Sequence, residues 1–377
     1  MNGIDAGRVG WRLPRADAGV LTGGFIASRL IIGLAAVIAE NLLPRNPALT
    51  SGEPGAILRS LTSWDGWYYL GITLDGYHAA PVAGTYHDYA FLPLYPAIVS
   101  VLSLPWPQYA GLVAVVVSNA AFAVAMVLLY HLGRPFLGGR RAALAPVLLA
   151  IVPFGAAFAM AYAESLFLAL SLGAFLAAER DRRAVAGVLL ALACLTRLQG
   201  LVLVVPLLVL FLRRDAGRPR VSLLWLGLGP LAGLAYFAYV ARLTGDIGAY
   251  GQAMVAWGRT GLGGTGGSIA EGIVGGGATS VILGVLLVTL LVSVFLLVYI
   301  RHSALRLEYA LIPILYLVVV MGSGLLESVG RYAMLAFPYA WILASREHPL
   351  FRTAWPPLSA GLLAVFSLLA FAGYWVP

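Results

Sequence analysis

The sequence predicts an all-α membrane protein that crosses the bilayer many times, and three observations support this fold class. Of its 377 residues, 61% are apolar and only 11% are charged, and the mean hydropathy is +0.90. The apolar residues form many runs close to the roughly 20 residues that a helix needs to cross a bilayer. The basic residues lie in short clusters between these runs, where they set membrane orientation.

The apolar runs predict about eleven transmembrane helices. They are 20–42, 110–132, 142–157, 160–178, 184–197, 199–213, 221–243, 279–300, 308–326, 332–345 and 355–376. Connections rich in arginine alternate with connections that are poor in it, so the positive-inside rule predicts a cytoplasmic N-terminus and an external C-terminus. No small-residue cleavage site follows the first run, which we therefore expect to remain as an uncleaved helix.

Two long connections fall on the predicted external side of a single membrane domain spanning 1–377, namely 43–109 and 244–278. Within the first, 91–104 is apolar but short, contains Pro93 and Pro96, and would invert all later loops if it crossed the membrane. We expect interfacial or re-entrant helices there. The second connection is rich in glycine. This composition fits either a mobile lid over a site or a plain surface loop.

Two helix pairs are too short for two full crossings. One pair occupies 142–178 and is interrupted by Pro153, Phe154 and Gly155, and the other occupies 184–212 and turns near Arg197. Both turns should therefore lie below the outer surface, where irregular backbone is tolerated only if it lines a cavity or is buried in protein. These lengths predict a recessed polar pocket that opens outward.

Seven isolated charges fall on the predicted external side. They are Asp65, Glu164, Arg197, Asp246, Arg259, Glu327 and Arg331. A charge against hydrocarbon costs roughly 2.5–3.5 kcal/mol on insertion scales, so a shared cavity is the simplest explanation for the set. Arg29, near the middle of the first span, has no partner that the sequence reveals.

Individual roles remain open at this level. Asp65 lies between Trp64 and Trp67, where a partly desolvated carboxylate is suited to accept a proton, but an aspartate at this position also makes a good helix N-cap. Glu164 and Arg197 could form a structural ion pair, or Arg197 could clamp a phosphate.

The remaining candidates have similar alternatives. Glu327 and Arg331 could neutralise each other one helical turn apart, or Arg331 could hold an anionic oxygen while Glu327 orients it. Asp246 and Arg259 are loop charges, which are usually solvated. Asp88, beside His87, could join Asp65 in a base or cation site.

Composition and residue spacing argue against several classes of protein and of binding site. The 24 basic residues give a formal charge of +8, but their place between apolar spans argues against nucleic-acid binding. All of them are arginine, which is typical of a high-GC bacterial genome. Cys194 is the only cysteine, and the five histidines have no ligand spacing, so we expect no metal and no disulfide.

Several short motifs, in order, resemble those of the PIG-V-like mannosyltransferases, the relatives of GPI mannosyltransferase 2. They are Trp64-Asp65, Tyr69-Leu70, Gly76-Tyr77, Phe91-Leu92-Pro93-Leu94-Tyr95-Pro96, Tyr162-Ala163-Glu164-Ser165-Leu166-Phe167, Thr196-Arg197 with Gly200, Gly245-Asp246 with Gln252 and Trp257, and Gly330-Arg331-Tyr332 with Phe337-Pro338. Each is weak alone, but together they extend from about residue 25 to 345.

The resemblance implies a GT-C type glycosyltransferase with an external active site in the cell membrane. It implies a polyprenyl-phosphate-mannose donor, a lipid-linked or cell-envelope glycan acceptor, an inverting mechanism and no cofactor. By the same resemblance Asp65 is the catalytic base, and Arg197 and Arg331 hold the donor phosphate. Further site candidates are Trp64, His87, Asp88, Glu164, Asp246, Arg259, Glu327 and Tyr332. The alternatives are a transporter or flippase of an anionic lipid, and a GT-C transferase of another sugar.

Overall fold

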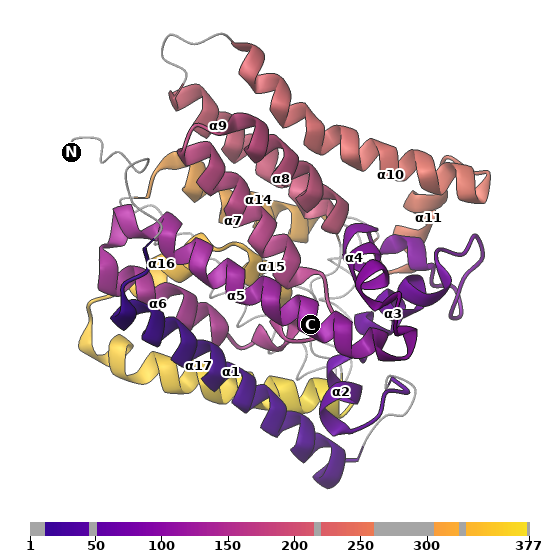
Figure 1. Cartoon of the computed structure of the whole chain (residues 1–377), viewed down its shortest axis with the longest axis horizontal. Coiled ribbons are helices and arrows are strands. Elements are labelled where there is room, and N and C mark those ends of the chain that lie inside the picture. Colours follow the sequence, from indigo (N-terminus) through magenta and orange to yellow (C-terminus); the bar gives the residue numbers. More distant parts are fainter. Residues whose placement is uncertain (1–11, 45–50, 215–219, 260–304, 324–328, 375–377) are drawn as a thin grey trace.

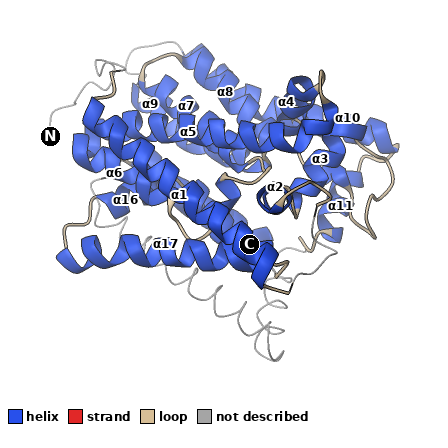
Figure 2. Cartoon of the chain, turned by 60° about the horizontal axis from the view of Figure 1, so that its bottom comes forward, coloured by secondary structure: helices blue, strands red, loops and turns tan. Residues whose placement is uncertain are grey.

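The computed structural model describes residues 12–44, 51–214, 220–259, 305–323 and 329–374 (Figure 1). Over these residues the chain consists of helices and loops, with one isolated β-bridge between Ala83 and Tyr86 (Figure 2). The all-α prediction is therefore confirmed for the described part of the chain.

Four described segments are long and apolar enough to cross a membrane. They are Arg15–Leu42, Pro107–Leu137, Val221–Thr244 and Pro349–Phe371. They contain helices α1 (Arg15–Leu42), α5 (Ala110–Leu137), α10 (Leu228–Thr244) and α17 (Pro349–Phe371). This is a membrane protein, and the number of its crossings stays a prediction.

Shorter helices fill the space between the long ones. They are α6 (Gly139–Ala150), α7 (Glu164–Glu179), α8 (Arg183–Thr196), α9 (Val204–Arg214), α14 (Leu307–Ser323), α15 (Val329–Leu335) and α16 (Pro338–Ala344). Helix α7 is central and lies between α5 and α8, α10 covers α8, and α1 contacts both α6 and α17 (Figure 1). Most of these helices coincide with the predicted apolar spans, and the predicted span 279–300 lies outside the described residues.

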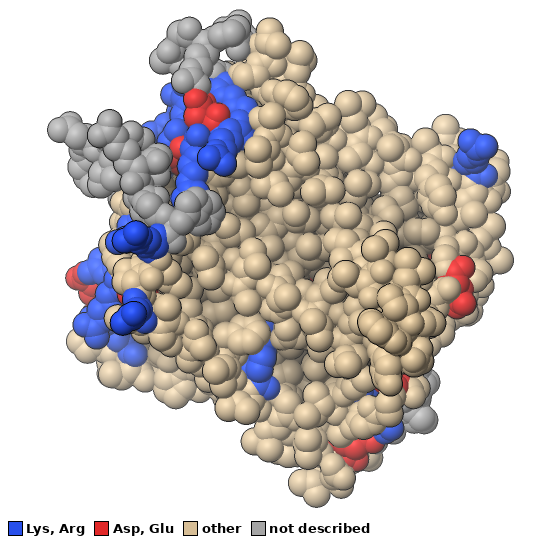
Figure 3. All heavy atoms as spheres, viewed as in Figure 1, with Lys and Arg blue, Asp and Glu red and all other residues tan. Residues whose placement is uncertain are grey.

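The predicted first external connection contains α2 (Ala56–Leu61), α3 (Asp65–Asp75), α4 (Leu94–Ser103) and short 3-10 turns. Helix α4 has ten residues, about 15 Å of helix, which is too short to cross a bilayer. It contacts α3 and α5. In the view of Figure 3, most charged atoms lie on the left and smaller groups lie at the right and lower right. The face between them is mostly uncharged apart from one basic patch near the lower middle.

Both predicted helix breaks are confirmed. Helix α6 ends at Ala150 and α7 begins at Glu164, with a buried irregular segment between them that includes the 3-10 turn Gly155–Phe158. After α8 the backbone becomes extended at Arg197, and a 3-10 turn covers Leu198–Leu203. At Gly200 a Cβ atom would lie 2.7 Å from the backbone nitrogen of Cys194, so only glycine fits this close return of the chain.

Candidate active site

Asp65 is the first residue of α3, and its carboxylate binds Arg331. Arg331 Nη1 donates to Asp65 Oδ2 at 2.7 Å, although 266 residues separate the two in the chain. The N-cap position of α3 belongs to Trp64, and no side chain caps this helix. The interpretation of Asp65 as a helix N-cap is therefore excluded, and its carboxylate binds Arg331 instead.

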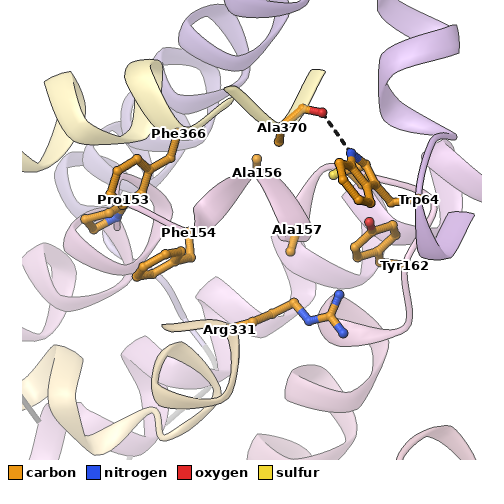
Figure 4. Close-up of a pocket in the computed structure, with 10 residues that line it drawn as sticks. Trp64, Pro153, Phe154, Ala156, Ala157, Tyr162, Arg331, Phe366 and Ala370 are labelled. Atoms are coloured by element: carbon orange, nitrogen blue, oxygen red, sulfur yellow. Dashed lines mark hydrogen bonds between the residues drawn. The ribbon is translucent and has the colours of Figure 1, made fainter. Parts of the chain in front are cut away.

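Trp64 holds the turn that presents Asp65. Its φ of +58° is rare for a residue with a Cβ atom, and such conformations cost of order 1–3 kcal/mol and cluster at functional sites. The indole Nε1 donates to the carbonyl of Ala370 in α17 at 2.8 Å, the dashed line in Figure 4. The last turn of α17 thus fixes the side chain of the strained residue.

Glu164 connects the two arginines of the site. It is the first residue of α7 and is fully buried. Its Oε1 accepts from Arg197 Nη1 at 2.5 Å and lies 3.0 Å from Arg331 Nε. The predicted Glu164–Arg197 pair is confirmed. Glu164 Oε2, in contrast, is buried with no hydrogen-bond partner in the described part of the chain.

Asp65, Arg331, Glu164 and Arg197 therefore form one continuous ion network, which we call the outer network. These residues come from α3, α15, α7 and the turn after α8, so the fold has assembled them from four distant parts of the chain. The start of α7 favours a carboxylate because unpaired backbone N–H groups and the helix dipole place positive potential there. Glu164 can therefore be buried where a carboxylate in mid-helix could not.

Arg259 adds a fifth charged group to this region, through its contact with Tyr332. The guanidinium groups of Arg197 and Arg259 lie 5.6 and 5.8 Å from the centre of the Tyr332 ring, and Arg259 Nη2 donates to the hydroxyl of this tyrosine. Tyr332 is 1% exposed. The arginine-rich environment continues from Arg331 through Arg197 to Arg259.

A small pocket that is partly open to its surroundings lies beside the outer network. Among the described residues that line it, Arg331 alone is charged, and in Figure 4 the phenol of Tyr162 lies between its guanidinium and the indole of Trp64. Arg331 also lies 5.5 Å from the centre of the Tyr162 ring. The rest of the lining is mainly apolar: Pro153, Phe154, Ala156, Ala157, Met160, Phe366 and Ala370. Such a pocket suits a ligand with one anionic end and an apolar body.

Aromatic rings cover the region next to Asp65. Tyr68, in the following turn of α3, stacks on Phe91 with ring centres 5.0 Å apart, and the ring of Trp257 meets both edge-on. Burial, together with the negative charge of Asp65 and the nearby Tyr86, raises the pKa of Tyr68 to about 12. Tyr68 therefore stays neutral at physiological pH.

Three predicted site residues make contacts elsewhere. Asp88 accepts from the backbone and the ring of His78, with Nδ1 at 2.9 Å, and so closes the intervening loop. His87 accepts from Trp257 through its carbonyl, at 3.2 Å. Asp246 accepts from the Gly248 backbone and from Gln252 beside α11 (Ala249–Ala256). Glu327 and the glycine-rich stretch 261–277 lie outside the described residues.

A second ion network, the inner network, lies at the opposite end of α7. Glu179, the last residue of this helix, accepts from Arg214 and Tyr309 at 2.7 Å each and pairs with Arg306. Glu308 pairs with Arg213 and Arg306. Sequence reasoning missed this network because these charges stand at helix ends among arginine clusters that already had an explanation as orientation signals.

Sequence reasoning also missed the apolar side of the pocket. Phe366 and Ala370 belong to a C-terminal helix with no unusual feature, and only the fold brings them to Trp64. Tyr162 was named within a motif but received no role. Among the described residues, no group of three or more histidine, cysteine, aspartate or glutamate side chains could hold a metal ion.

The family model described as mannosyltransferase (PIG-V) matches residues 35–214 of this chain. The resemblance predicted from the motifs is thus confirmed over a segment that contains Asp65, Glu164 and Arg197. A search of curated proteins finds no significant match.

Solved structures with a similar fold include two GT-C glycosyltransferases. The chain matches ArnT from Cupriavidus metallidurans, bound to undecaprenyl phosphate, with a TM-score of 0.52 and 12% identity over 94% of this chain and 76% of that one. It matches the Archaeoglobus fulgidus oligosaccharyltransferase, tethered with an acceptor peptide, with a TM-score of 0.51 and 15% identity over 97% of this chain. The apo form of that enzyme gives 0.52 and 14%.

These likenesses show the fold. The chain spans just over half the length of the oligosaccharyltransferase, 56% in both structures, so it matches only part of that enzyme. The fold is that of GT-C glycosyltransferases, and together with the family model it supports a glycosyltransferase activity.

Proposed function

We propose that the protein transfers mannose from a polyprenyl-phosphate-mannose donor to a glycan or glycolipid acceptor on the external face of the cell membrane. One observation carries this proposal: Arg331 lines a mainly apolar pocket while its guanidinium binds Asp65 and approaches Glu164. A cation at one end of an apolar pocket matches a phosphate attached to an isoprenoid chain. The ArnT structure similar to this chain holds undecaprenyl phosphate, a lipid of that class.

In this mechanism Arg331 exchanges partners. When the donor binds, its phosphate takes the guanidinium from Asp65, because a phosphate and an arginine form a strong bidentate pair. Asp65 is then free to accept the proton of the acceptor hydroxyl. Base assistance of this kind is worth about 10²–10⁴ in rate.

The transfer itself is a single displacement that inverts the anomeric carbon. The acceptor oxygen forms a bond to C1 of mannose as its proton passes to Asp65, and the C1–O bond to phosphate breaks with its electron pair on the phosphate. Negative charge grows on the leaving phosphate, where Arg331 stabilises it. Arg197, which is largely buried behind Glu164, adds positive potential from the protein side.

The choice of sugar rests on the family model, and the choice of an external site rests on the positive-inside pattern of the sequence. No metal ion is required in this mechanism, because arginine side chains supply the positive charge.

The decisive experiment incubates the purified protein with polyprenyl-phosphate mannose and a membrane-lipid extract. Release of polyprenyl phosphate together with a mannosylated product is expected. Movement of the intact donor between the leaflets of a vesicle, without cleavage, would instead establish a flippase. Parallel reactions with polyprenyl-phosphate glucose and a polyprenyl-phosphate pentose test the sugar, and transfer from one of these but not from the mannose donor would correct it.

A further inference from the structure

Arg29 is a charged residue inside the first long helix that forms no ion pair with any described carboxylate. It lies 14 residues after the start of α1, about 21 Å along the helix. Its three donor atoms bind uncharged groups: Nε donates to Asn119 Oδ1 at 2.7 Å, Nη1 to Ser28 Oγ at 3.1 Å and Nη2 to the Phe158 carbonyl at 3.1 Å. A charge at bilayer depth is costly and marks a functional position by default, so these contacts need an explanation.

Two aromatic rings hold the guanidinium in place. Phe25 of α1 and Phe122 of α5 each have their ring centre 4.5 Å from Arg29 Cζ. Phe122 in turn stacks on Phe158, with ring centres 4.6 Å apart. The guanidinium of Arg29, a residue of α1, is thus held against α5 and the irregular segment that follows α6.

The target of this contact is the backbone of 158–162. Asn119 Nδ2 donates to the Ala159 carbonyl at 3.0 Å, and Ser118 Oγ donates to the Tyr162 carbonyl at 3.0 Å. Carbonyls of an irregular segment must find donors at membrane depth, and here side chains of α1 and α5 supply them, together with Ser165 Oγ of α7, which also donates to the Phe158 carbonyl at 2.8 Å. We call this set of donors, formed by Arg29, Asn119 and Ser118, the clamp.

The clamped segment leads directly into the outer network. Tyr162 contacts the guanidinium of Arg331, and Glu164 follows two residues later. The amide of Ala161 donates to the Leu61 carbonyl at 2.7 Å, which ties the same segment to the chain four residues before Asp65. A shift of 158–162 would therefore move the supports of Arg331 and the approach to Asp65 together.

We propose that Arg29 and Asn119 are positioning residues for the transfer reaction: they clamp the segment 158–162 so that Glu164 and Tyr162 keep Arg331 beside Asp65. This inference rests on the proposed function for its kinetic part and on the geometry of the clamp for its structural part. Arginine suits the role because its planar fork reaches Asn119 and the Phe158 carbonyl at once, whereas a lysine carries its charge on a single nitrogen.

The competing explanation is that Arg29 only joins α1 to α5. In that case its loss would reduce the amount of folded protein, and the effect would be independent of Glu164. The clamp predicts a different result, because Arg29 then acts through the residues that lead to Glu164. The effects on kcat of substituting two residues that act along one path are not additive.

The experiment combines backbone exchange with kinetics on the full-length protein in detergent. Arg29→Met is compared with Leu30→Met, a control at the neighbouring, largely exposed position of the same helix. Arg29→Met should speed amide hydrogen exchange in a peptide covering 155–163 and lower kcat per folded molecule by about 10–100-fold, the scale expected of a misplacement near 1 Å. Leu30→Met should change neither.

The coupling to Glu164 decides between the two explanations. In a Glu164→Gln background, Arg29→Met should change kcat by less than about twofold, because its path of action is already broken. An equal fold-loss in both backgrounds would overturn the proposal, as would unchanged exchange in 155–163. Arg29→Lys should fall between wild type and Arg29→Met, and full recovery would show that charge alone matters.

Two safeguards keep the result interpretable. If Arg29→Met does not fold, Asn119→Leu takes its place with the same expectations, because it removes the donor to Ala159 and leaves the charge of Arg29 intact. If the wild-type protein transfers no mannose, the proposed function fails while hydrogen exchange in 155–163 still decides whether the clamp exists.

Discussion

The two ion networks at the ends of α7 are built from the same groups and differ in how fully their carboxylate oxygens are satisfied. Glu164 begins the helix and Glu179 ends it, about 22 Å apart. Each region combines two carboxylates with three arginines, if Arg259 is counted with the outer network. Charge therefore does not distinguish them.

The carboxylate oxygens distinguish them, although Arg306 Nε and Nη2 of the inner network and Arg331 Nε of the outer one lack a hydrogen bond among the described residues. In the inner network both oxygens of Glu179 and both oxygens of Glu308 accept hydrogen bonds. In the outer network one oxygen of Glu164 has no partner among the described residues, and Arg331 lines a pocket. Arg331, a buried cation that lines a cavity, can therefore meet an anionic ligand, whereas a network whose carboxylates are fully engaged serves the fold. Five predictions test this distinction.

The largest effect is expected at Asp65. Asp65→Asn keeps the shape of the side chain but removes the proposed base, so transfer of mannose should fall by about 10²–10⁴-fold while the protein remains folded. Release of polyprenyl phosphate from the donor measures this directly. Asp65→Glu serves as the control and should retain part of the activity. Near-normal turnover of the Asn variant would remove Asp65 from the role of base.

Arg331 should rank second. Arg331→Lys keeps a positive charge but loses the fork that binds Asp65 and Glu164 and, in the proposed mechanism, the donor phosphate. We expect kcat/KM for the donor to fall by about 10²-fold. The matched change in the inner network, Arg214→Lys, should leave kcat/KM within about twofold. Equal losses at the two positions would contradict the distinction between the networks.

Glu179 should show the reverse pattern, with stability affected and catalysis spared. Glu179→Gln removes the anion that pairs with Arg214 and leaves Arg306 with Glu308 alone. Breaking a buried pair typically costs 3–5 kcal/mol, but these two arginines reach solvent, so about 2–3 kcal/mol is expected here. The apparent melting temperature in detergent should drop by several degrees. A specific activity that falls more than about threefold per folded molecule would give the inner network a catalytic role.

Much of the fold was predictable because apolar length and helix-breaking residues are local signals. The segment 142–178 was expected to break near Pro153, and α6 and α7 do separate there. The length argument also placed Arg197 in a recessed turn. The number of crossings and the span 279–300 were not tested, because they depend on a membrane or on residues outside the described part.

The sequence could predict which residues form the site but not which of them pair with one another. Isolated charges in an apolar chain identified Asp65, Glu164, Arg197 and Arg331, because such charges are costly unless they meet. The sequence could not reveal that Arg331 pairs with Asp65, since 266 residues separate them. Nor could it show that Arg29 contacts Asn119, since an amide side chain is uncharged and does not stand out in an apolar segment as a carboxylate does.

Trp64 offers a smaller test, directed at the support of the outer network. Trp64→Phe keeps an aromatic ring but loses the hydrogen bond from Nε1 to the Ala370 carbonyl, which is worth about 1 kcal/mol. If that energy holds Asp65 in position, kcat should fall by about fivefold with little change in melting temperature. Phe366→Leu, on the same pocket wall, is the control for lost ring contacts. A wild-type rate would show that the strained turn at Trp64 does not need its anchor.

The smallest effect is expected from removal of divalent metal ions. A leaving phosphate needs positive charge, which either a metal ion or fixed guanidinium groups can supply. Asp65 and Glu164 each pair with an arginine, and the positive charge of Arg331 and Arg197 opposes the binding of a metal cation beside them. Excess EDTA should therefore change the transfer rate by less than about twofold, and added Mg²⁺ or Mn²⁺ should not raise it. A loss of tenfold or more that Mn²⁺ restores would mean that the outer network binds its anion through a metal ion. The outer network would then differ from the inner network by a metal, and no longer only by the way its arginines are used.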